Sequence, residues 1–297
     1  SGLEYLSVNA ASTEDLLMLA KPLVAAGDIS TTHMRSETDA ILEAMKAAYE
    51  IGRLRRVPVI ISHLKCAGMD NWGRSGEVLD SLDAKRTSQP VGWDCYPYAA
   101  SSTVLRLDRC DKGVRILITW STPHPEMANR ALSDIAREWG CSERAAAERL
   151  LPAGAVYFQL DEADVRSILS YPQTMIGSDG LPHDEHPHPR LWGTFPRVLG
   201  HYVRELGLFP LEQAVFRMTG LPAREFGIAR RGRIAAGNFA DITVFDPETV
   251  GDNATFENPR RASAGIALVL LNGQVVWQDG QATGARPGRV LKRAAVH

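Results

Sequence analysis

TMIGSDGLPHDEHPHPRLWG, residues 174–193, carries the most informative pattern in the chain. A short apolar run, residues 174–176, stops at a Gly-Ser-Asp-Gly turn whose glycines let the backbone bend sharply and place Asp179 at a strand end. The prolines that follow exclude helix or central strand, so we expect a stiff loop that carries Arg190. Gly-Ser-Asp-Gly alone is equally typical of an ordinary turn, so the upstream sequence has to decide.

Upstream, apolar runs alternate with helical patterns. The run VPVIISH at 57–63 is typical of a buried parallel strand, and further strand-like runs occur at 28–35 and 91–96. The helices expected between them lie at 13–27, 37–53 and 75–86. This alternation predicts a (β/α)-barrel, in which the chemistry occurs at the carboxyl ends of the strands. The four predicted strands end in His33, His63, Tyr96 and Asp179.

Two other regions differ from this alternation. Residues 99–171 are longer than a simple crossover needs, so we expect an insertion there. After Gly227 the sequence is rich in turns, and Asn272-Gly273 predicts a β-hairpin. We therefore expect a barrel region over 1–227 and a small β domain over 228–297. Further helices are expected at 125–139, 143–150, 194–206 and 211–218.

Composition narrows the classes of protein. The chain has 297 residues with 33 basic and 35 acidic side chains, well mixed, which argues against nucleic-acid binding. No apolar run reaches the ~18 residues needed to span a bilayer, and no secretory signal is visible. The four cysteines show no CxxC spacing and indicate reduced thiols. We expect a cytoplasmic protein that binds neither nucleic acid nor membrane.

Two histidines at the ends of successive strands suggest a metal site. Adjacent strands lie about 4.8 Å apart, so His33 and His63 could reach one ion. Zinc accepts histidine nitrogen and keeps an open position in catalytic sites. Asp179 could complete the ligand set or act as the base for a bound water. A single strand-end histidine is more often structural, but the three residues together favour a metal-dependent hydrolase.

Other residues near the strand ends suit a substrate carboxylate. Arg190 offers a planar, bidentate donor, Lys65 follows His63 closely, and Tyr96 can donate one hydrogen bond. The alternatives are an ion-paired surface arginine, a surface lysine and a core tyrosine. The loop histidines are expected to be solvated or bonded to backbone, and two cysteines near strand ends to pack as small apolar residues. These residues are His183, His186, His188, Cys66 and Cys95.

The motifs resemble those of the N-acyl-D-amino-acid deacylases, or D-aminoacylases, of the amidohydrolase superfamily. The resemblance rests on THMR (32–35), ISHLK (61–65), YPY (96–98), GSDG…PHPRLWG (177–193) and the tail over 232–246. It implies a Zn²⁺-dependent enzyme that hydrolyses the amide bond of a small N-acyl-D-amino acid. The matching positions are His33 and His63 for zinc, Asp179 for the proton shuttle, and Lys65, Tyr96 and Arg190 for the substrate carboxylate.

The sequence departs from this family on its N-terminal side. The family has an HxH pair on the first barrel strand and a cysteine ligand on an earlier strand, and neither occurs upstream of His33. The chain therefore looks like the C-terminal half of a TIM-like (β/α)8 hydrolase barrel plus a small β-rich domain. Four parallel strands cannot close an eight-stranded barrel. We expect either a missing N-terminal segment that completes it, or an isolated chain that is inactive and poorly soluble.

Two other functions stay open at this point. One is an amidohydrolase acting on cyclic amides, of the hydantoinase or dihydroorotase type. The other is a metal-free fragment that serves as a folding or interaction unit. Within the deacylase interpretation, Arg106 or Arg109 could bind an acidic substrate side chain, although two solvated arginines are the more common case.

Overall fold

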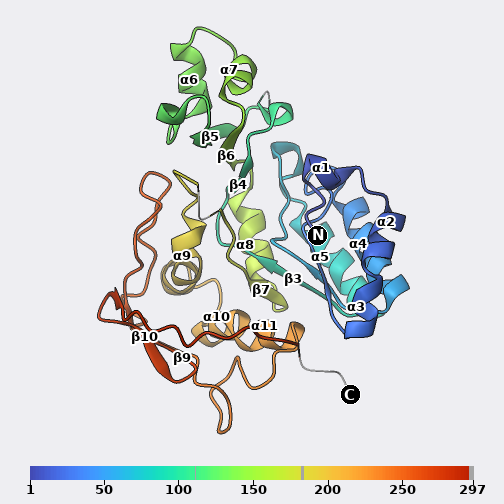
Figure 1. Cartoon of the computed structure of the whole chain (residues 1–297), viewed down its shortest axis with the longest axis vertical. Helices are drawn as coiled ribbons and strands as arrows, with labels where there is room; N and C mark the ends of the chain where they lie inside the picture. Colours follow the sequence, from blue (N-terminus) through green and yellow to red (C-terminus); the bar gives the residue numbers. More distant parts are fainter. Residues whose placement is uncertain (111, 182–183, 294–297) are drawn as a thin grey trace.

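A parallel sheet forms the centre of the molecule. Figure 1 shows the chain as a computed structural model that describes residues 1–110, 112–181 and 184–293. Four strands are hydrogen-bonded in the order β1-β2-β3-β7, all parallel. They are β1 (Ser30–Thr32), β2 (Val59–Ile61), β3 (Val91–Cys95) and β7 (Thr174–Ile176). The four strands predicted from the sequence are therefore confirmed, and their carboxyl ends meet at one edge.

Three helices cover one face of this sheet. They are α4 (Ile41–Arg55), α5 (Ser75–Arg86) and α8 (Glu162–Ser170), and each contacts at least one parallel strand. Ile61 and Trp93 lie in the main apolar core beneath them. Alternate residues face the other way, where Ile60 and Met175 pack with Leu221 in a separate cluster. Helices outside and an apolar inner face confirm the predicted partial (β/α) barrel.

The first helical region differs from the prediction of one helix over 13–27. The structure has α1 (Leu6–Asn9), α2 (Thr13–Leu19) and α3 (Lys21–Ala26). The break occurs because Pro22 has no N–H and is tolerated only in a first helical turn. The helix predicted at 37–53 also begins later, at Ile41. Ser36 and Thr38 form local side-chain hydrogen bonds that compete with the helix before that point.

Residues 99–171 contain a second sheet that the sequence did not predict. β4 (Ser101–Val104), β5 (Arg115–Ser121) and β6 (Ala153–Phe158) are antiparallel in the order β4-β6-β5.

The helix predicted at 143–150 is confirmed as α7 (Glu143–Leu150). The one at 125–139 is only partly correct, because Asn129 has a φ of 63°. A 3₁₀ turn at Pro125–Met127 precedes it and α6 (Leu132–Glu138) follows. Figure 1 shows α6 and α7 at the top, away from α10 and α11. Two further 3₁₀ turns lie at Met69–Asn71 and Leu107–Arg109.

The C-terminal region begins with helices. α9 (Arg190–Arg197) runs into η4 (Val198–Glu205), a π-helical segment, and α10 (Leu211–Met218) and α11 (Gly220–Glu225) follow. The strands β8 (Ile242–Phe245), β9 (Ile266–Leu271), β10 (Gln274–Gln278) and β11 (Gln281–Ala282) then form an antiparallel sheet. The hairpin predicted at Asn272-Gly273 joins β9 to β10 and is confirmed. The division at residue 227 stays a prediction.

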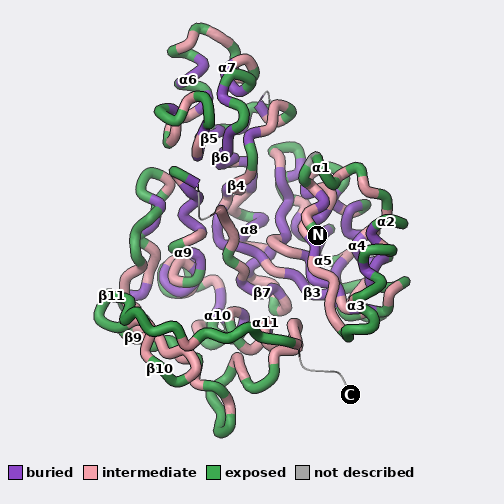
Figure 2. Tube along the Cα trace, in the orientation of Figure 1, coloured by how far each residue is buried: buried purple, intermediate pink, exposed green. Residues whose placement is uncertain are grey.

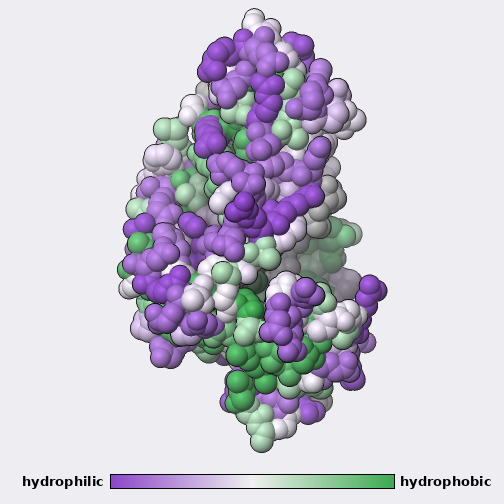
Figure 3. Space-filling view, turned by 90° about the vertical axis from the view of Figure 1, so that its left-hand side faces the viewer, coloured by the Kyte–Doolittle hydropathy of each residue, from purple (hydrophilic) through white to green (hydrophobic). Residues whose placement is uncertain are grey.

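The antiparallel sheet β8–β11 is poorly covered. None of its residues is buried, as Figure 2 shows. Figure 3 shows apolar side chains gathered on the lower part of the face that carries this sheet. Val244 on β8 is 46% exposed and Ile234, in the preceding loop, 86%. Within the described ranges, no helix is both long enough and apolar enough to cross a membrane.

Candidate active site

His33 and His63 lie side by side beyond the carboxyl ends of β1 and β2. Their ring centroids are 4.3 Å apart, and the ring planes make an angle of 79°. Thr32 and Ile61 are paired in the parallel register, so His33, one residue after Thr32, and His63, two residues after Ile61, reach the same edge of the sheet. The structure therefore brings together the two residues predicted to bind zinc.

A buried carboxylate, Glu37, contacts both imidazoles. Its Oε1 lies 3.0 Å from Nδ1 of His63, 3.6 Å from Nε2 of His33 and 2.5 Å from Nζ of Lys65. Burial alone would raise the pKa of Glu37, but the charges of Lys65 and His63 hold it far below its usual range. Burial likewise acts to lower the pKa of Lys65, and Glu37 outweighs it and raises that pKa. The two residues form a buried ion pair.

The side chains present fit a bound cation. His33, Glu37 and His63 each offer one ligand atom, and these atoms lie within 4.8 Å of one another. Imidazole nitrogen and carboxylate oxygen are both ligands that zinc accepts. Nε2 of His33 also lies 2.9 Å from Oε2 of Glu4, so a second carboxylate oxygen borders the same place.

His63 adopts an uncommon backbone conformation. Its φ of 43° lies in the left-handed region, which a residue with a side chain rarely occupies. Its backbone N–H donates to Oδ1 of Asp94 on β3, at 2.9 Å. Burial raises the pKa of Asp94, and the hydrogen bond from His63 only partly offsets this. A Cβ at Gly177 would lie 2.3 Å from Asp94, so only glycine leaves room for this carboxylate.

Asp179 and Arg190 form the second half of the site. Asp179 follows β7, and its Oδ2 lies 2.9 Å from Nη2 of Arg190. Arg190 is buried at the start of α9, donates to the carbonyl oxygen of Ser102 at 3.1 Å, and lies 4.5 Å from the ring centroid of Tyr96. The proline-rich loop therefore begins at Asp179 and ends at Arg190, and the two residues contact each other.

A hollow of about 460 Å³ lies along the inner face of the sheet. His33, His63, Asp94 and Asp179 are among the residues that line it. Phe226, which follows α11, lines it as well. The volume falls in the range of small-molecule sites. The predicted ligands and the predicted base therefore share one opening.

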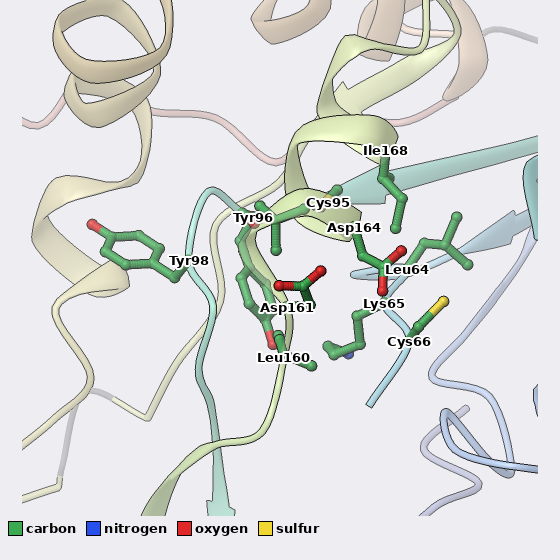
Figure 4. A pocket seen from close by; sticks show the side chains of 11 residues that line it. Leu64, Lys65, Cys66, Cys95, Tyr96, Tyr98, Leu160, Asp161, Asp164 and Ile168 are labelled. Carbon is green, nitrogen blue, oxygen red and sulfur yellow. Dashed lines mark hydrogen bonds between the residues drawn. The ribbon is translucent and has the colours of Figure 1, made fainter. Parts of the chain in front are cut away.

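Tyr96 and Lys65 lie beside this opening. Burial raises the pKa of Tyr96 to about 12, so its hydroxyl stays protonated and can donate. The hydroxyl of Tyr96 and Nε of Arg190 are buried and bond to no described residue. Figure 4 shows Lys65 and Tyr96 on a void of about 10 Å³, which is too small for a substrate. The two unpaired donors are therefore the strongest sign of a missing polar ligand.

Residues of the 99–171 region contact Glu4, which in turn contacts His33. Arg106 and Arg109 both contact Oε1 of Glu4, Arg106 at 3.7 Å. Burial raises the pKa of Glu4, but the hydrogen bond to His33 and the charge of Arg109 outweigh it and lower that pKa. The two arginines are thus ion-paired rather than solvated. A role in binding an acidic substrate side chain stays a prediction.

The loop histidines have other partners, as expected from the prolines. His188 is buried; its ring lies 3.1 Å from the carbonyl oxygen of Ala100 and accepts from the backbone N–H of Arg190 at 3.0 Å. His186 lies 2.5 Å from the carbonyl oxygen of Phe256. His183 lies outside the described residues. Burial also raises the pKa of the Cys66 and Cys95 thiols, consistent with packing rather than ligation.

Three residues of the site were missed from the sequence. Glu37 follows His33 by four positions in a loop. Asp94 is the fourth residue of β3, inside the run 91–96 that was interpreted only as a strand. Glu4 comes just after a short bridge that pairs Gly2 with His33 in parallel. Of these three residues, only Glu37 has a signal in the sequence, which is its spacing of four positions from His33. Asp94 and Glu4 reach the site through strand pairing, which the sequence does not show.

The chain is similar to several known proteins. An amidohydrolase family model matches residues 130–277. D-aminoacylase from Alcaligenes xylosoxydans xylosoxydans is 52% identical over 295 residues, which are 99% of this chain and 61% of that protein. N-acyl-D-glutamate deacylase from the same organism is 48% identical over 99% of this chain and 60% of that protein.

Solved structures show the same relationship. A crystal structure of D-aminoacylase, 53% identical, has a TM-score of 0.95 over 98% of this chain and 61% of that chain. N-acyl-D-glutamate deacylase from Bordetella bronchiseptica, solved with zinc and a phosphonate inhibitor, is 49% identical with a TM-score of 0.93, over the same shares of the two chains. The chain belongs to the amidohydrolase family. Within that family it groups with the N-acyl-D-amino-acid deacylases, and it spans about three fifths of the length of these relatives.

Proposed function

We propose that this chain carries the proton-transfer and substrate-binding part of a zinc-dependent N-acyl-D-amino-acid deacylase. The observation that carries the proposal is the shared opening, which His33, His63 and Asp179 all line. Similarity to D-aminoacylase over 99% of the chain supports the substrate class, and the zinc-bound relative supports the metal. The products are a carboxylate and a free D-amino acid.

The side chains have distinct roles in this proposal. His33 and His63 hold the zinc ion, which when bound supplies a Lewis acid for the amide carbonyl and an activated water. Asp179, 37% exposed at the opening, takes the proton of the attacking water and passes it to the leaving amine. Its ion pair with Arg190 aims the carboxylate towards the opening.

Substrate orientation comes from the donors on the other side of the opening. The unpaired Tyr96 hydroxyl and the Nε of Arg190 supply hydrogen bonds to the α-carboxylate. The Lys65 ammonium has three N–H donors, so one can reach the substrate while another stays on Glu37. Fixing the carboxylate on one side and the amide on the other orients the α-carbon, and selection of the D configuration requires a third contact, with the substrate side chain.

A further polypeptide segment completes the barrel in this proposal. The parallel sheet has four strands, whereas a closed barrel of this type has eight. The poorly covered sheet β8–β11 and the exposed side chains of Met18 and Leu19, at 72% and 76%, also leave apolar surface to bury. The segment would supply the remaining metal ligands.

The test compares the chain alone with the chain plus a segment covering the rest of the D-aminoacylase length. Zinc content is measured by elemental analysis, and hydrolysis of N-acetyl-D-methionine, its L enantiomer and a cyclic hydantoin is followed by product separation. We expect zinc and D-specific hydrolysis in the completed protein. Less than about a tenth of an equivalent of zinc, with no hydrolysis, would exclude the proposal. Turnover of the hydantoin alone would instead favour the cyclic-amide alternative.

A further inference from the structure

The His63 ring contacts the polar atoms of described residues through one nitrogen. Nδ1 lies 2.7 Å from Nζ of Lys65 and 3.0 Å from Oε1 of Glu37. Nε2 has no polar contact with a described residue, and the ring borders the 460 Å³ hollow. The nitrogen that is free to bind a ligand is therefore Nε2, provided that Nδ1 carries the proton.

Two groups compete for Nδ1, and they require opposite tautomers. An ammonium group can only donate, so a hydrogen bond from Lys65 would need an unprotonated Nδ1. A carboxylate can only accept, so a hydrogen bond to Glu37 needs a proton on Nδ1. The tautomer of His63, and hence its ability to bind a metal through Nε2, depends on which contact prevails.

The geometry favours Glu37. Glu37 Oε1, Lys65 Nζ and His63 Nδ1 form a triangle with sides of 2.5, 2.7 and 3.0 Å. The angle at Lys65 is too acute for an ammonium, whose N–H bonds diverge tetrahedrally, to aim at both neighbours. Its shorter contact, with the opposite charge, goes to Glu37, which leaves the second lone pair of that oxygen for His63.

We propose that Glu37 is a positioning residue that fixes His63 with its proton on Nδ1 and holds Lys65 beside Tyr96. The assignment of Nε2 as a zinc-binding nitrogen rests on the proposed function. The tautomer of His63 does not depend on that function. Lys65 lies 5.4 Å from the ring centroid of Tyr96, so one carboxylate sets the position of both a metal ligand and a substrate contact. Carboxylates that orient the second nitrogen of a histidine serve the same purpose in other metal sites.

The experiment reads the tautomer directly. The whole chain is labelled with ¹⁵N-histidine, and two-bond ¹H–¹⁵N correlation spectra are recorded at about pH 8.5, where histidine is neutral. His63→Asn identifies the signals. We expect Nδ1 of His63 to be protonated in the wild-type chain and in Lys65→Met, which keeps the carboxylate. Glu37→Gln gives a mixture of tautomers, because the amide can donate as well as accept.

A second variant and a control keep the result clear. Glu37→Gln leaves Lys65 buried without its counter-charge, so Glu37→Gln with Lys65→Met removes both charges and is expected to show the same mixture. Glu43→Gln makes the same chemical change on α4 at a side chain that is 69% exposed, and it should leave the His63 signals unchanged. Thermal unfolding of each variant separates loss of stability from loss of the tautomer.

Each outcome decides the inference. A proton on Nε2 in the wild-type chain overturns it, and so does a single Nδ1–H tautomer that survives in the double variant. A titration with zinc alone separates the two proposals. We expect Glu37→Gln to bind zinc about 10- to 100-fold more weakly than wild type. If the wild-type chain, alone and completed, binds no zinc while the tautomers behave as expected, the proposed function fails and the positioning role of Glu37 stands.

Discussion

Asp179 and Arg190 are joined by an ion pair across the proline-rich loop, with Oδ2 and Nη2 2.9 Å apart. The same Nη2 also donates to the carbonyl oxygen of Ser102, and the guanidinium of Arg190 stacks over Tyr96. The loop is therefore closed at its base, and the carboxylate that faces the opening is aimed by a buried cation. This relationship makes the two residues separable by experiment, because one moves a proton and the other positions groups.

Asp179→Asn should lower kcat in the completed protein by about 10²- to 10⁴-fold, the range for loss of a general base. The amide oxygen can still accept from Arg190, so zinc content and the midpoint of thermal unfolding should change little. Steady-state kinetics on N-acetyl-D-methionine and elemental analysis of the same sample provide the measurement. A variant that keeps more than about a tenth of wild-type kcat would show that Asp179 is not the base.

Arg190→Lys should raise KM more than it lowers kcat, by about tenfold or more, because an ammonium cannot replace a planar fork that stacks on Tyr96. Arg197 offers a matched control, since it stacks 5.0 Å from the ring centroid of Tyr98 and bonds to the carbonyl oxygen of Pro97. Arg197→Lys should leave KM close to the wild-type value. Equal effects from the two substitutions would argue against a substrate contact by Arg190.

His188 should make stability depend on pH. Burial and then the charge of Arg190 hold its pKa well below the ordinary value of 6.5. The unfolded chain therefore takes up a proton first, so this contribution is complete above pH 6.5 and is lost as the pH falls. Urea unfolding should show a loss of up to about 1.4 kcal/mol per pH unit below that value. His188→Asn should lack this component, and an unchanged slope would contradict the assignment.

Thiol reactivity should be limited to one cysteine in the native chain. Cys66, Cys95 and Cys110 are buried, and burial raises the pKa of Cys66 to about 12, so the reactive thiolate is scarce. Cys141 is partly exposed. Titration with a chromogenic disulfide should give one equivalent in buffer and four in urea, the number in the sequence. Cys141→Ser should remove the native reaction, and two fast equivalents would contradict the burial.

The strand ends were predictable because they depend on local pattern. Apolar runs that stop at His33, His63 and Asp179 fix both the strands and the edge where they meet, since parallel strands in register align their ends. The insertion was harder, because β4, β5 and β6 pair over distances in sequence that no local pattern records. The prediction of one helix over 13–27 was wrong at Pro22. The break could have been predicted, because this proline is visible in the sequence.

The surroundings of the predicted site residues could not be derived from the sequence. Lys65 was expected to face a substrate, and its burial against Glu37 arises from a partner 28 residues away. The pairing of Arg106 and Arg109 with Glu4 likewise joins residues more than 100 positions apart. Patterns with a period of two or 3.6 residues indicate which side chains face a core, but not which charges meet there.

The left-handed backbone at His63 has a consequence for how this position tolerates change. Glycine would relax the φ of 43° and remain compatible with the hydrogen bond to Asp94, so it suits the main chain better than histidine does. A library sorted only for thermostability should therefore drift towards glycine here, at the cost of the imidazole. The presence of histidine at a place where folding alone favours the smallest residue marks a demand on this position other than stability.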